Sequence, residues 1–238
     1  MKASAIVVAA GSGLRLGMAQ PKALVPLGRD PILYYCLRTL AQVAQISELI
    51  ISAPPTHLAA VGELAQRAAA RLIPTVVSGG AQRQDSVRCA IQRLSPDAEL
   101  VVIHDAARPF ASATLFEACL NAAARVGASL ACVPVADTLK EAEGSFVRAT
   151  RSRQALYQAQ TPQAFTRSVL LAAHARAGGD SATDDALLAE QIGQRVEIVM
   201  GSPLNFKITT AEDLRLAQAL LAGDPELAAR FSGADFQT

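Results

Sequence analysis

The chain has 238 residues, 51% of them hydrophobic, which is enough to bury one large core, and no long polar stretch divides it. Its formal net charge is +1 and its basic residues are scattered, so the charge pattern of a nucleic-acid-binding protein is missing. We therefore expect one domain spanning residues 1–238 that binds no nucleic acid.

Short β-branched runs alternate with longer segments of helical period, and this alternation predicts a βαβα order. Strands are expected near Ala5–Val8, Glu48–Ser52, Thr75–Val77, Glu99–Ile103, Ser129–Val133 and Arg195–Met200. Helices are expected near Pro31–Ala44, His57–Ala70, Arg83–Leu94 and Ala113–Ala124. The predicted fold is therefore α/β, a mostly parallel Rossmann-like sheet with helices on both faces and a protruding β-hairpin arm.

The first of these helices has a clear start and a clear apolar face. Asp30 is expected to be its N-cap, with Pro31 at the first helical position. Its apolar face is expected to consist of Leu33, Cys36, Leu40 and Val43.

The segment Asp137–Arg153 interrupts the alternation, because it is polar, has short strand patterns and turns at Glu143–Ser145. We expect a hairpin arm over 137–153. A two-stranded arm cannot bury a face alone, so it is expected either to fold over the site or to pack on a second copy of the chain.

After the arm, helices are expected near Arg167–Ala177 and Asp185–Gln191, with Thr183–Asp185 more naturally capping the second helix than touching a substrate. The last helix is expected to begin at a capping box, Thr209–Glu212. The polar tail after Asp224 is expected to be loosely attached.

Nothing in the sequence indicates export or a membrane span. The first residues lead straight into a short strand, and no apolar stretch approaches about 18 residues. The cysteines form no Cys-x-x-Cys pair, which argues against a disulfide framework or a zinc site, and they are expected to be buried: Cys36, Cys89, Cys119 and Cys132. We expect a soluble cytoplasmic protein.

A glycine-rich run follows the first strand, from Ala9 to Gly17, and Pro21-Lys22 comes shortly after it. Glycines that open from a strand expose backbone N–H groups to phosphate oxygens, and nearby cations neutralise them. The third glycine of a dinucleotide fingerprint is replaced by Leu16, and no Walker A run exists in the chain. The alternative reading is a glycine turn that only reverses the chain.

Polar residues also follow other strands, and in an open parallel sheet such positions converge on one edge. Asp105 directly follows a strand, where its carboxylate could hold Mg²⁺ together with phosphate oxygens. The alternative role of Asp105 is to cap the loop that follows. Arg108 suits a phosphate, or an ion pair with Asp105 or Asp137. His104 fits a packed, satisfied side chain better than a base.

Two further places remain open between ligand binding and a structural role. Lys207 lies close to the positive end of a helix, which favours an anionic ligand beside it, or it is simply solvated. The Gly79-Gly80 pair precedes a helix whose N-terminus would face the ligand, or Asp85 or Ser86 merely caps that helix.

A series of ordered motifs resembles the 2-C-methyl-D-erythritol 4-phosphate cytidylyltransferases of the non-mevalonate isoprenoid pathway. The motifs span nearly the whole chain: Ala9-Ala10-Gly11-x-Gly13-x-Arg15 with Pro21-Lys22, Gly79-Gly80 followed by Arg83-x-x-Ser86-Val87, His104-Asp105-Ala106-Ala107-Arg108-Pro109, Asp137-Thr138, Thr161-Pro162-Gln163, Thr183-Asp184-Asp185 and Asn205-x-Lys207. Many sugar-phosphate nucleotidyltransferases share single glycine motifs, whereas the ordered set is specific to this family.

The resemblance implies a transfer of CMP from CTP to methylerythritol phosphate. It implies nucleotide binding by Ala9, Ala10, Gly11, Ser12, Gly13, Arg15, Lys22, Gly80, Ser86 and Asp105. It implies acceptor binding by Asp105, Arg108, Thr138, Arg153, Thr161 and Lys207. Arg15, Lys22 and Lys207 would stabilise the charge of transfer, and Asp105 would hold Mg²⁺. The family is homodimeric through the arm, from which Arg153 would reach a partner's site.

Two departures from the family pattern matter. Ala81 stands where some relatives have an acidic residue beside the base pocket, and the sequence ends before a fused cyclodiphosphate synthase domain, so a second activity is not expected. Two alternatives also stay open. One is a cytidylyltransferase for another polyol phosphate such as ribitol 5-phosphate, and the other is a non-catalytic nucleotide-binding module.

Overall fold

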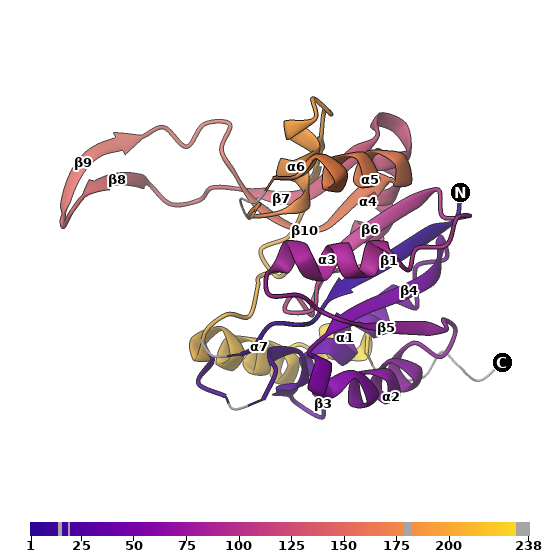
Figure 1. Ribbon diagram of the computed structural model, residues 1–238. Helices are drawn as coiled ribbons and strands as arrows, with labels where there is room; N and C mark the ends of the chain where they lie inside the picture. The colour runs from indigo at the N-terminus through magenta and orange to yellow at the C-terminus, as the bar shows by residue number, and fades with distance from the viewer. Residues whose placement is uncertain (14–15, 19, 179–181, 232–238) are drawn as a thin grey trace.

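A twisted central sheet with helices on both sides forms the body of the protein in the computed structural model (Figure 1). The structure describes residues 1–13, 16–18, 20–178 and 182–231. Within these residues the sheet has seven strands in the order β11-β7-β10-β6-β1-β4-β5. The strands are β1 (Ala3–Val8), β4 (Ile46–Ala53), β5 (Pro74–Ser78), β6 (Leu100–Asp105), β7 (Ala128–Pro134), β10 (Tyr157–Thr166) and β11 (Glu197–Met200).

The sheet is parallel except for β10, which runs antiparallel to β6 and to β7. Strand β1 pairs with β4 on one side and with β6 on the other. The chain therefore leaves β1 toward β4 and β5, and later returns to the opposite side of β1 at β6. This reversal of direction opens a crevice beyond the carboxyl ends of β1 and β6.

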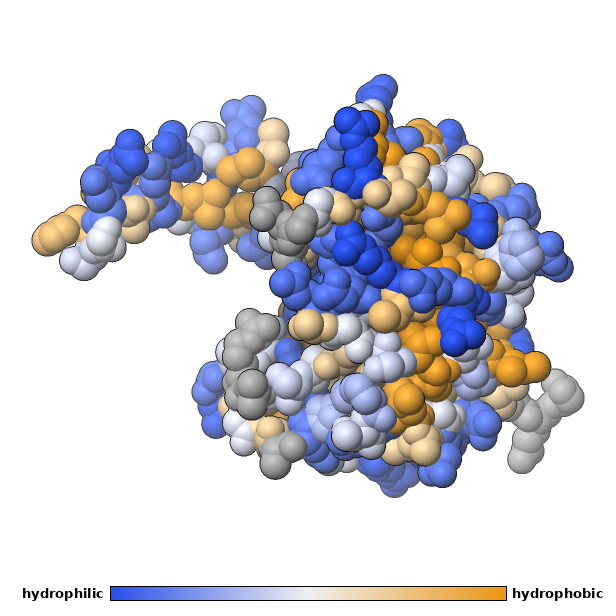
Figure 2. Space-filling model, viewed as in Figure 1, coloured by the Kyte–Doolittle hydropathy of each residue, from blue (hydrophilic) through white to orange (hydrophobic). Residues whose placement is uncertain are grey.

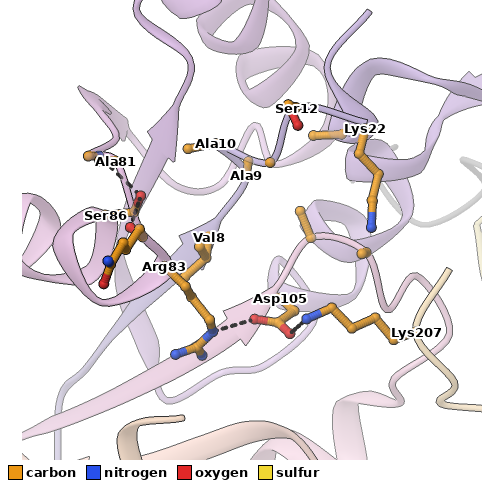
Figure 3. A pocket seen from close by; sticks show the side chains of 16 residues that line it. Val8, Ala9, Ala10, Ser12, Lys22, Ala81, Arg83, Ser86, Asp105 and Lys207 are labelled. Carbon is orange, nitrogen blue, oxygen red and sulfur yellow. Dashed lines mark hydrogen bonds and ion pairs between the residues drawn. The ribbon is translucent and has the colours of Figure 1, made fainter. Parts of the chain in front are cut away.

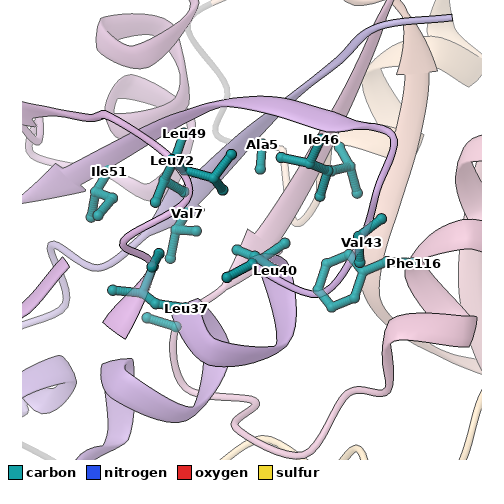
Figure 4. Close-up of a cluster of buried hydrophobic side chains, with 14 of the residues drawn as sticks. Ala5, Val7, Leu37, Leu40, Val43, Ile46, Leu49, Ile51, Leu72 and Phe116 are labelled. Carbon is teal, nitrogen blue, oxygen red and sulfur yellow. The ribbon is translucent and has the colours of Figure 1, made fainter. Parts of the chain in front are cut away.

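Successive side chains of β1 point to opposite faces of the sheet, as the period of a strand requires. Ala5 and Val7 belong to a cluster with α1 (Ile32–Leu40), α2 (Leu58–Ala68) and α4 (Ala113–Val126). Figure 4 shows this cluster where α1 packs beneath β1 and β4. Ile6 joins the other cluster, with α3 (Arg83–Ile91), α5 (Arg167–Arg176) and α6 (Asp185–Gln191). Both faces are thus covered, as predicted.

A third apolar cluster joins the C-terminal helices α7 (Ala211–Gly223) and α8 (Pro225–Ala229) to α1 and to the connection that precedes it. The prediction of a loosely attached tail after Asp224 was wrong for α8, because Leu227 and Phe231 are buried against this cluster. Residues 232–238 lie outside the described residues.

The predicted strands and helices are confirmed at all positions named, but β10 was not predicted. Its sequence contains Pro162 and several polar residues, and both features argue against a strand in the middle of a sheet. Gln160, Thr161 and Gln163 are nevertheless buried there. Their side chains find hydrogen-bond partners on distant segments, which offsets the cost of their burial.

Two predicted helix caps need correction. Helix α1 begins at Ile32 with Pro31 as its N-cap, and Asp30 forms an ion pair with Arg67 at 2.7 Å instead of capping. Helix α7 has its capping box one residue later than predicted, with Thr210 as the N-cap and Asp213 as the reciprocal acceptor. In contrast, Asp184 caps α6 as expected, since its side chain accepts a bond from the amide of Leu187.

The predicted arm is present as a hairpin of β8 (Leu139–Glu143) and β9 (Phe146–Arg151), which turns at Gly144 with a φ of 58°. Figure 1 shows that the arm extends away from the body rather than folding over it. Its surface mixes hydrophilic and hydrophobic residues (Figure 2), and Phe146 and Val147 are 78% and 64% exposed. The arm therefore leaves apolar side chains uncovered.

Short elements complete the fold: η2 (Lys22–Leu24), β2 (Pro26–Leu27), β3 (Asp30–Pro31) and η3 (Pro55–His57). Cys36, Cys119 and Cys132 are buried as predicted, whereas Cys89 is only partly buried. Among the described residues, no helix has the length and apolar character that crossing a membrane requires.

Candidate active site

A cleft of about 370 Å³ lies beyond the carboxyl ends of β1 and β6, at the point where the chain reverses its direction across the sheet. Figure 3 shows the cleft from close by. It is lined by Val8, Ala9, Ala10, Gly11, Ser12, Lys22, Ala23, Gly80, Ala81, Gln82, Arg83, Ser86, Asp105, Ala106, Ala107 and Lys207. Segments far apart in sequence thus meet at one edge, as the sequence predicted.

The glycine loop after β1 closes on itself. Lys22 donates its main-chain N–H to the carbonyl of Gly11 at 3.1 Å. Gly13 has a φ of +74°, and a Cβ there would lie 2.7 Å from the carbonyl oxygen of Gln20. Only glycine fits this position without strain. Arg15, for which the sequence predicted binding to phosphates, lies outside the described residues.

The loop presents main-chain donors toward the cleft. Among the described residues, none accepts a hydrogen bond from the N–H of Gly11 or of Ser12. The side chain of Lys22 extends toward the part of the cleft where Asp105 and Lys207 lie (Figure 3). Backbone donors combined with an ammonium group form a site that favours an anion.

The opposite wall is the N-terminal end of α3. Gln82 is the N-cap, and it forms a capping box with Asp85, so neither Asp85 nor Ser86 is the cap residue. The Ser86 hydroxyl accepts a bond from the N–H of Gly80 and donates to the carbonyl of Gln82, both at 3.1 Å. These bonds fix the Gly80–Gln82 turn that forms the wall.

Asp105 holds two cations at the centre of the cleft. One carboxylate oxygen accepts from Nε of Arg83 at 3.0 Å, and the other accepts from Nζ of Lys207 at 2.6 Å (Figure 3). Burial alone would raise the pKa of Asp105, but Arg83 and Lys207 hold it well below its usual range. The anion expected beside Lys207 is, in this structure, the carboxylate of Asp105.

The cleft suits a divalent cation only together with a phosphorylated ligand. Among the described residues, no group of three or more acidic, histidine or cysteine side chains could hold a metal ion. Asp105 is the one carboxylate in the described lining of the cleft, and an ionised carboxylate still has acceptor sites beyond the two in use. Mg²⁺ is held by one or two carboxylates plus phosphate oxygens. The residues present therefore fit Mg²⁺ that arrives with a phosphate.

His104 is a packed and satisfied side chain, as the sequence favoured. Its Nε2 lies 3.0 Å from the carbonyl of Arg108, so this nitrogen carries the proton. Its Nδ1 therefore accepts from the hydroxyl of Thr161, which in turn accepts from the N–H of Asp105. Burial lowers the pKa of His104 to about 4. A neutral ring bonded on both sides positions the end of β6 and does not act as a base.

Arg108 and Thr161 lie close to the cleft but do not line it. Arg108 donates to the carbonyl of Asn205 at 2.8 Å and to that of Ala159 at 3.3 Å. The alternative role, an ion pair of Arg108 with Asp105 or Asp137, does not occur in the described structure. The Nε of Arg108 is buried without a hydrogen-bond partner. A phosphate contact by Arg108 stays a prediction.

Thr138 and Arg153 lie at the base of the arm, where both are exposed. No described residue of the arm lines the cleft of the same chain. The structure therefore does not bring these two residues to the remainder of the site.

The sequence suggested no role for Arg83, and it suggested only helix capping for Asp185 as part of Thr183–Asp185. Arg83 lines the cleft and also donates to Asp185 at 2.6 Å, a contact between residues 102 positions apart. Both residues belong to motifs that the sequence singled out, but only the folded chain brings the motifs together.

The fold and the cleft define an α/β protein whose sheet carries main-chain amides and cations at its carboxyl edge, an arrangement that suits a phosphorylated ligand. Residues 3–223 match the family model of 2-C-methyl-D-erythritol 4-phosphate cytidylyltransferase. The chain belongs to this family, and the resemblance seen in its motifs is confirmed.

Relatives and solved structures agree with this assignment. A protein of that name from Saccharopolyspora erythraea is 43% identical over 227 residues, covering 93% of this chain and 100% of the relative. One from Halalkalibacterium halodurans is 39% identical, covering 93% of this chain and 98% of the relative. The crystal structure of the cytidylyltransferase from Thermus thermophilus has a TM-score of 0.79 and 35% identity, covering 93% of this chain and 100% of that one.

The buried histidine predicts an acid-sensitive fold. Because the pKa of His104 is near 4 in the folded state and near 6.5 when unfolded, the unfolded chain binds the proton more readily between these values. Stability from this residue is complete above about pH 6.5 and is lost as the pH falls to about 4, by about 3 kcal/mol. Urea unfolding at a series of pH values measures this change in the free energy of unfolding. A folded His104→Gln variant should lose less stability over this range, and an equal loss would contradict the assignment.

Proposed function

We propose that the chain transfers the cytidylyl group of CTP to the phosphate of 2-C-methyl-D-erythritol 4-phosphate and releases pyrophosphate. The product is 4-diphosphocytidyl-2-C-methyl-D-erythritol, an intermediate of the non-mevalonate isoprenoid pathway. The observation that carries the proposal is the cleft itself, where Arg83 and Lys207 pair with one carboxylate. Lys22 lines the same cleft, and the amides of Gly11 and Ser12 have no hydrogen-bond acceptor among the described residues. Its family membership supplies the identity of the two substrates.

The proposed reaction needs no general base. The second pKa of a phosphate monoester is about 6, so the acceptor is mostly dianionic at neutral pH. Its oxygen attacks the α-phosphorus of CTP in line, and negative charge grows on the equatorial oxygens and on the departing pyrophosphate. The described lining of the cleft contains no histidine, and the neighbouring His104 is bonded through both ring nitrogens, which agrees with this route.

Charge stabilisation is the chemistry we assign to the cleft. Gly11, Ser12 and Lys22 hold the triphosphate, joined by Arg15 from the same loop. Lys207 exchanges its carboxylate partner for phosphate oxygens, which is feasible because its side chain is 38% exposed. Gly80 and Ser86, with Ala9 and Ala10 opposite, border the nucleoside. Mg²⁺ held at Asp105 would neutralise phosphate charge.

We further infer that the arm packs on a second copy of the chain. A two-stranded hairpin is marginal alone, and this one exposes Phe146 and Val147 away from its own body. In a homodimer Thr138 and Arg153 would complete the acceptor site of the partner. A cytoplasmic location, where CTP is available, stays our expectation.

Pyrophosphate release tests the function directly. With CTP and Mg²⁺, we expect release with methylerythritol phosphate and little with ribitol 5-phosphate, and we expect EDTA to abolish it. Faster release with ribitol 5-phosphate would support the other polyol substrate. CTP binding without release, whichever acceptor is offered, would instead indicate a non-catalytic module.

Removing one cation from the cleft should reduce turnover. We expect Lys22→Ala and Lys207→Ala each to lower kcat by about 10²–10³, because each removes a charge placed where negative charge develops. Steady-state kinetics on folded variants measure this. Arg125→Ala, which breaks an exposed ion pair with Glu197, is the control. Near-normal turnover of Lys22→Ala would remove Lys22 from the catalytic set.

Arg153→Ala should act on the acceptor rather than on the nucleotide. If Arg153 binds methylerythritol phosphate across the dimer, the variant raises KM for that substrate far more than KM for CTP. Arg148→Ala, on the same arm, is the matched control and should change neither constant appreciably. Equal effects of Arg153→Ala on both KM values would argue against the assignment.

A further inference from the structure

Charged side chains continue from the cleft into the core. The guanidinium of Arg83 bridges two carboxylates, donating Nε to Asp105 at 3.0 Å and Nη1 to Asp185 at 2.6 Å. The second oxygen of Asp185 lies 3.0 Å from Nε2 of His174 on α5. Opposite charges therefore alternate from Lys207 through Asp105 and Arg83 to Asp185, where His174 ends the row.

Asp185 is ionised although it is only 1% exposed. Burial alone would raise the pKa of Asp185, but Arg83 and His174 lower it below its usual value. Because an ionised carboxylate only accepts hydrogen bonds, Nε2 of His174 must carry the proton that it shares with Asp185. The ionised carboxylate of Asp185 thus presents a negative charge to the guanidinium of Arg83.

The side chain of Asp185 is not needed for the start of its helix. Asp184 caps α6 through the amide of Leu187. The amide of Asp185 itself donates to Oε1 of Gln163. Burying a carboxylate is costly unless it has a partner. Because the buried side chain of Asp185 does not cap α6, its pairing with Arg83 points to a role in holding that guanidinium.

Arg83 becomes more important when a ligand arrives. Lys207 is 38% exposed and lies in the cleft, so incoming phosphate oxygens compete with Asp105 for it. Arg83 is only 20% exposed and is held on the far side by Asp185. Figure 3 shows Asp105 between the two cations, with Arg83 on one side and Lys207 on the other. With Lys207 engaged by phosphate, Arg83 would be the cation that still pairs with Asp105.

We propose that Asp185, supported by His174, is a positioning residue that holds the Arg83 guanidinium in the plane from which it orients the Asp105 carboxylate. This inference rests on the proposed function. It assigns to α5 and α6 a part in the reaction, although neither helix lines the cleft.

Asp185→Asn tests the proposal because it keeps the shape and removes the charge. We expect kcat to fall about 10- to 100-fold, as it does for other residues that orient a functional side chain without touching the substrate. We expect KM for CTP to change less than about threefold. Asp30→Asn is the matched control, since it breaks an ion pair with Arg67 on the surface. A folded Asp185→Asn enzyme with the kcat of the wild type would overturn the proposal.

A double variant separates positioning from general stability. If Asp185 acts through Arg83 on Asp105, Asp185→Asn should have little further effect on kcat in an Asp105→Asn background. A merely structural role would multiply the two losses, and that result would overturn the proposal. Circular dichroism and thermal unfolding of each variant report whether it is folded.

The histidine offers a second test should Asp185→Asn fail to fold. In His174→Gln the amide nitrogen replaces Nε2 as a donor to Asp185, whereas His174→Leu removes the donor and keeps an apolar side chain of similar bulk. We expect the glutamine variant to retain most of kcat and the leucine variant to lose at least about tenfold. Equal kcat values would overturn the proposal.

The outcomes for the two proposals are distinguishable. If the wild-type chain releases no pyrophosphate from CTP with any polyol phosphate, the proposed function fails. If the wild-type chain turns over and the Asp185 and His174 variants match it, the positioning role alone fails.

Discussion

The carboxylate of Asp105 connects the packing of the protein to its chemistry. It ends a buried strand, β6, and is held by Arg83 from α3 and by Lys207 from the segment before α7. A carboxylate in so enclosed a place stays ionised only with cations beside it. The contacts that join three distant segments therefore also gather positive charge in the cleft.

The position of these groups follows from the topology of the sheet. Because β1 pairs with β4 on one side and with β6 on the other, the glycine loop and Asp105 are neighbours although about 90 residues separate them. Helices cover both faces, so the carboxyl edge is where polar side chains reach solvent. At this edge Gly11 and Ser12 line one wall of the cleft, and Arg83 lines the opposite wall.

Local patterns in the sequence predicted the parallel strands, the flanking helices, the arm and most residues of the cleft. These patterns failed where contacts between distant segments determine the secondary structure or the role of a side chain. Strand β10 contains a proline and buried Gln160 and Gln163, whose partners Asn205, Asp185 and Ala186 follow much later in the chain. Asp184 and Asp185 are both typical of a helix start, and only the position of Arg83 shows which of them caps the helix.

His104 and Asp105 are consecutive residues of β6 with different roles, because one side chain packs in the core and the other lies in the cleft. Their side chains leave β6 on opposite faces, so His104 packs against Phe116 of α4 while Asp105 meets Arg83 of α3. Burial keeps the histidine neutral, and the aspartate brings a single negative charge to a described lining with three cations. The excess of positive charge suits the cleft to an anion such as a triphosphate. The ring of His104, which is bonded through both nitrogens, holds the end of β6 beneath it.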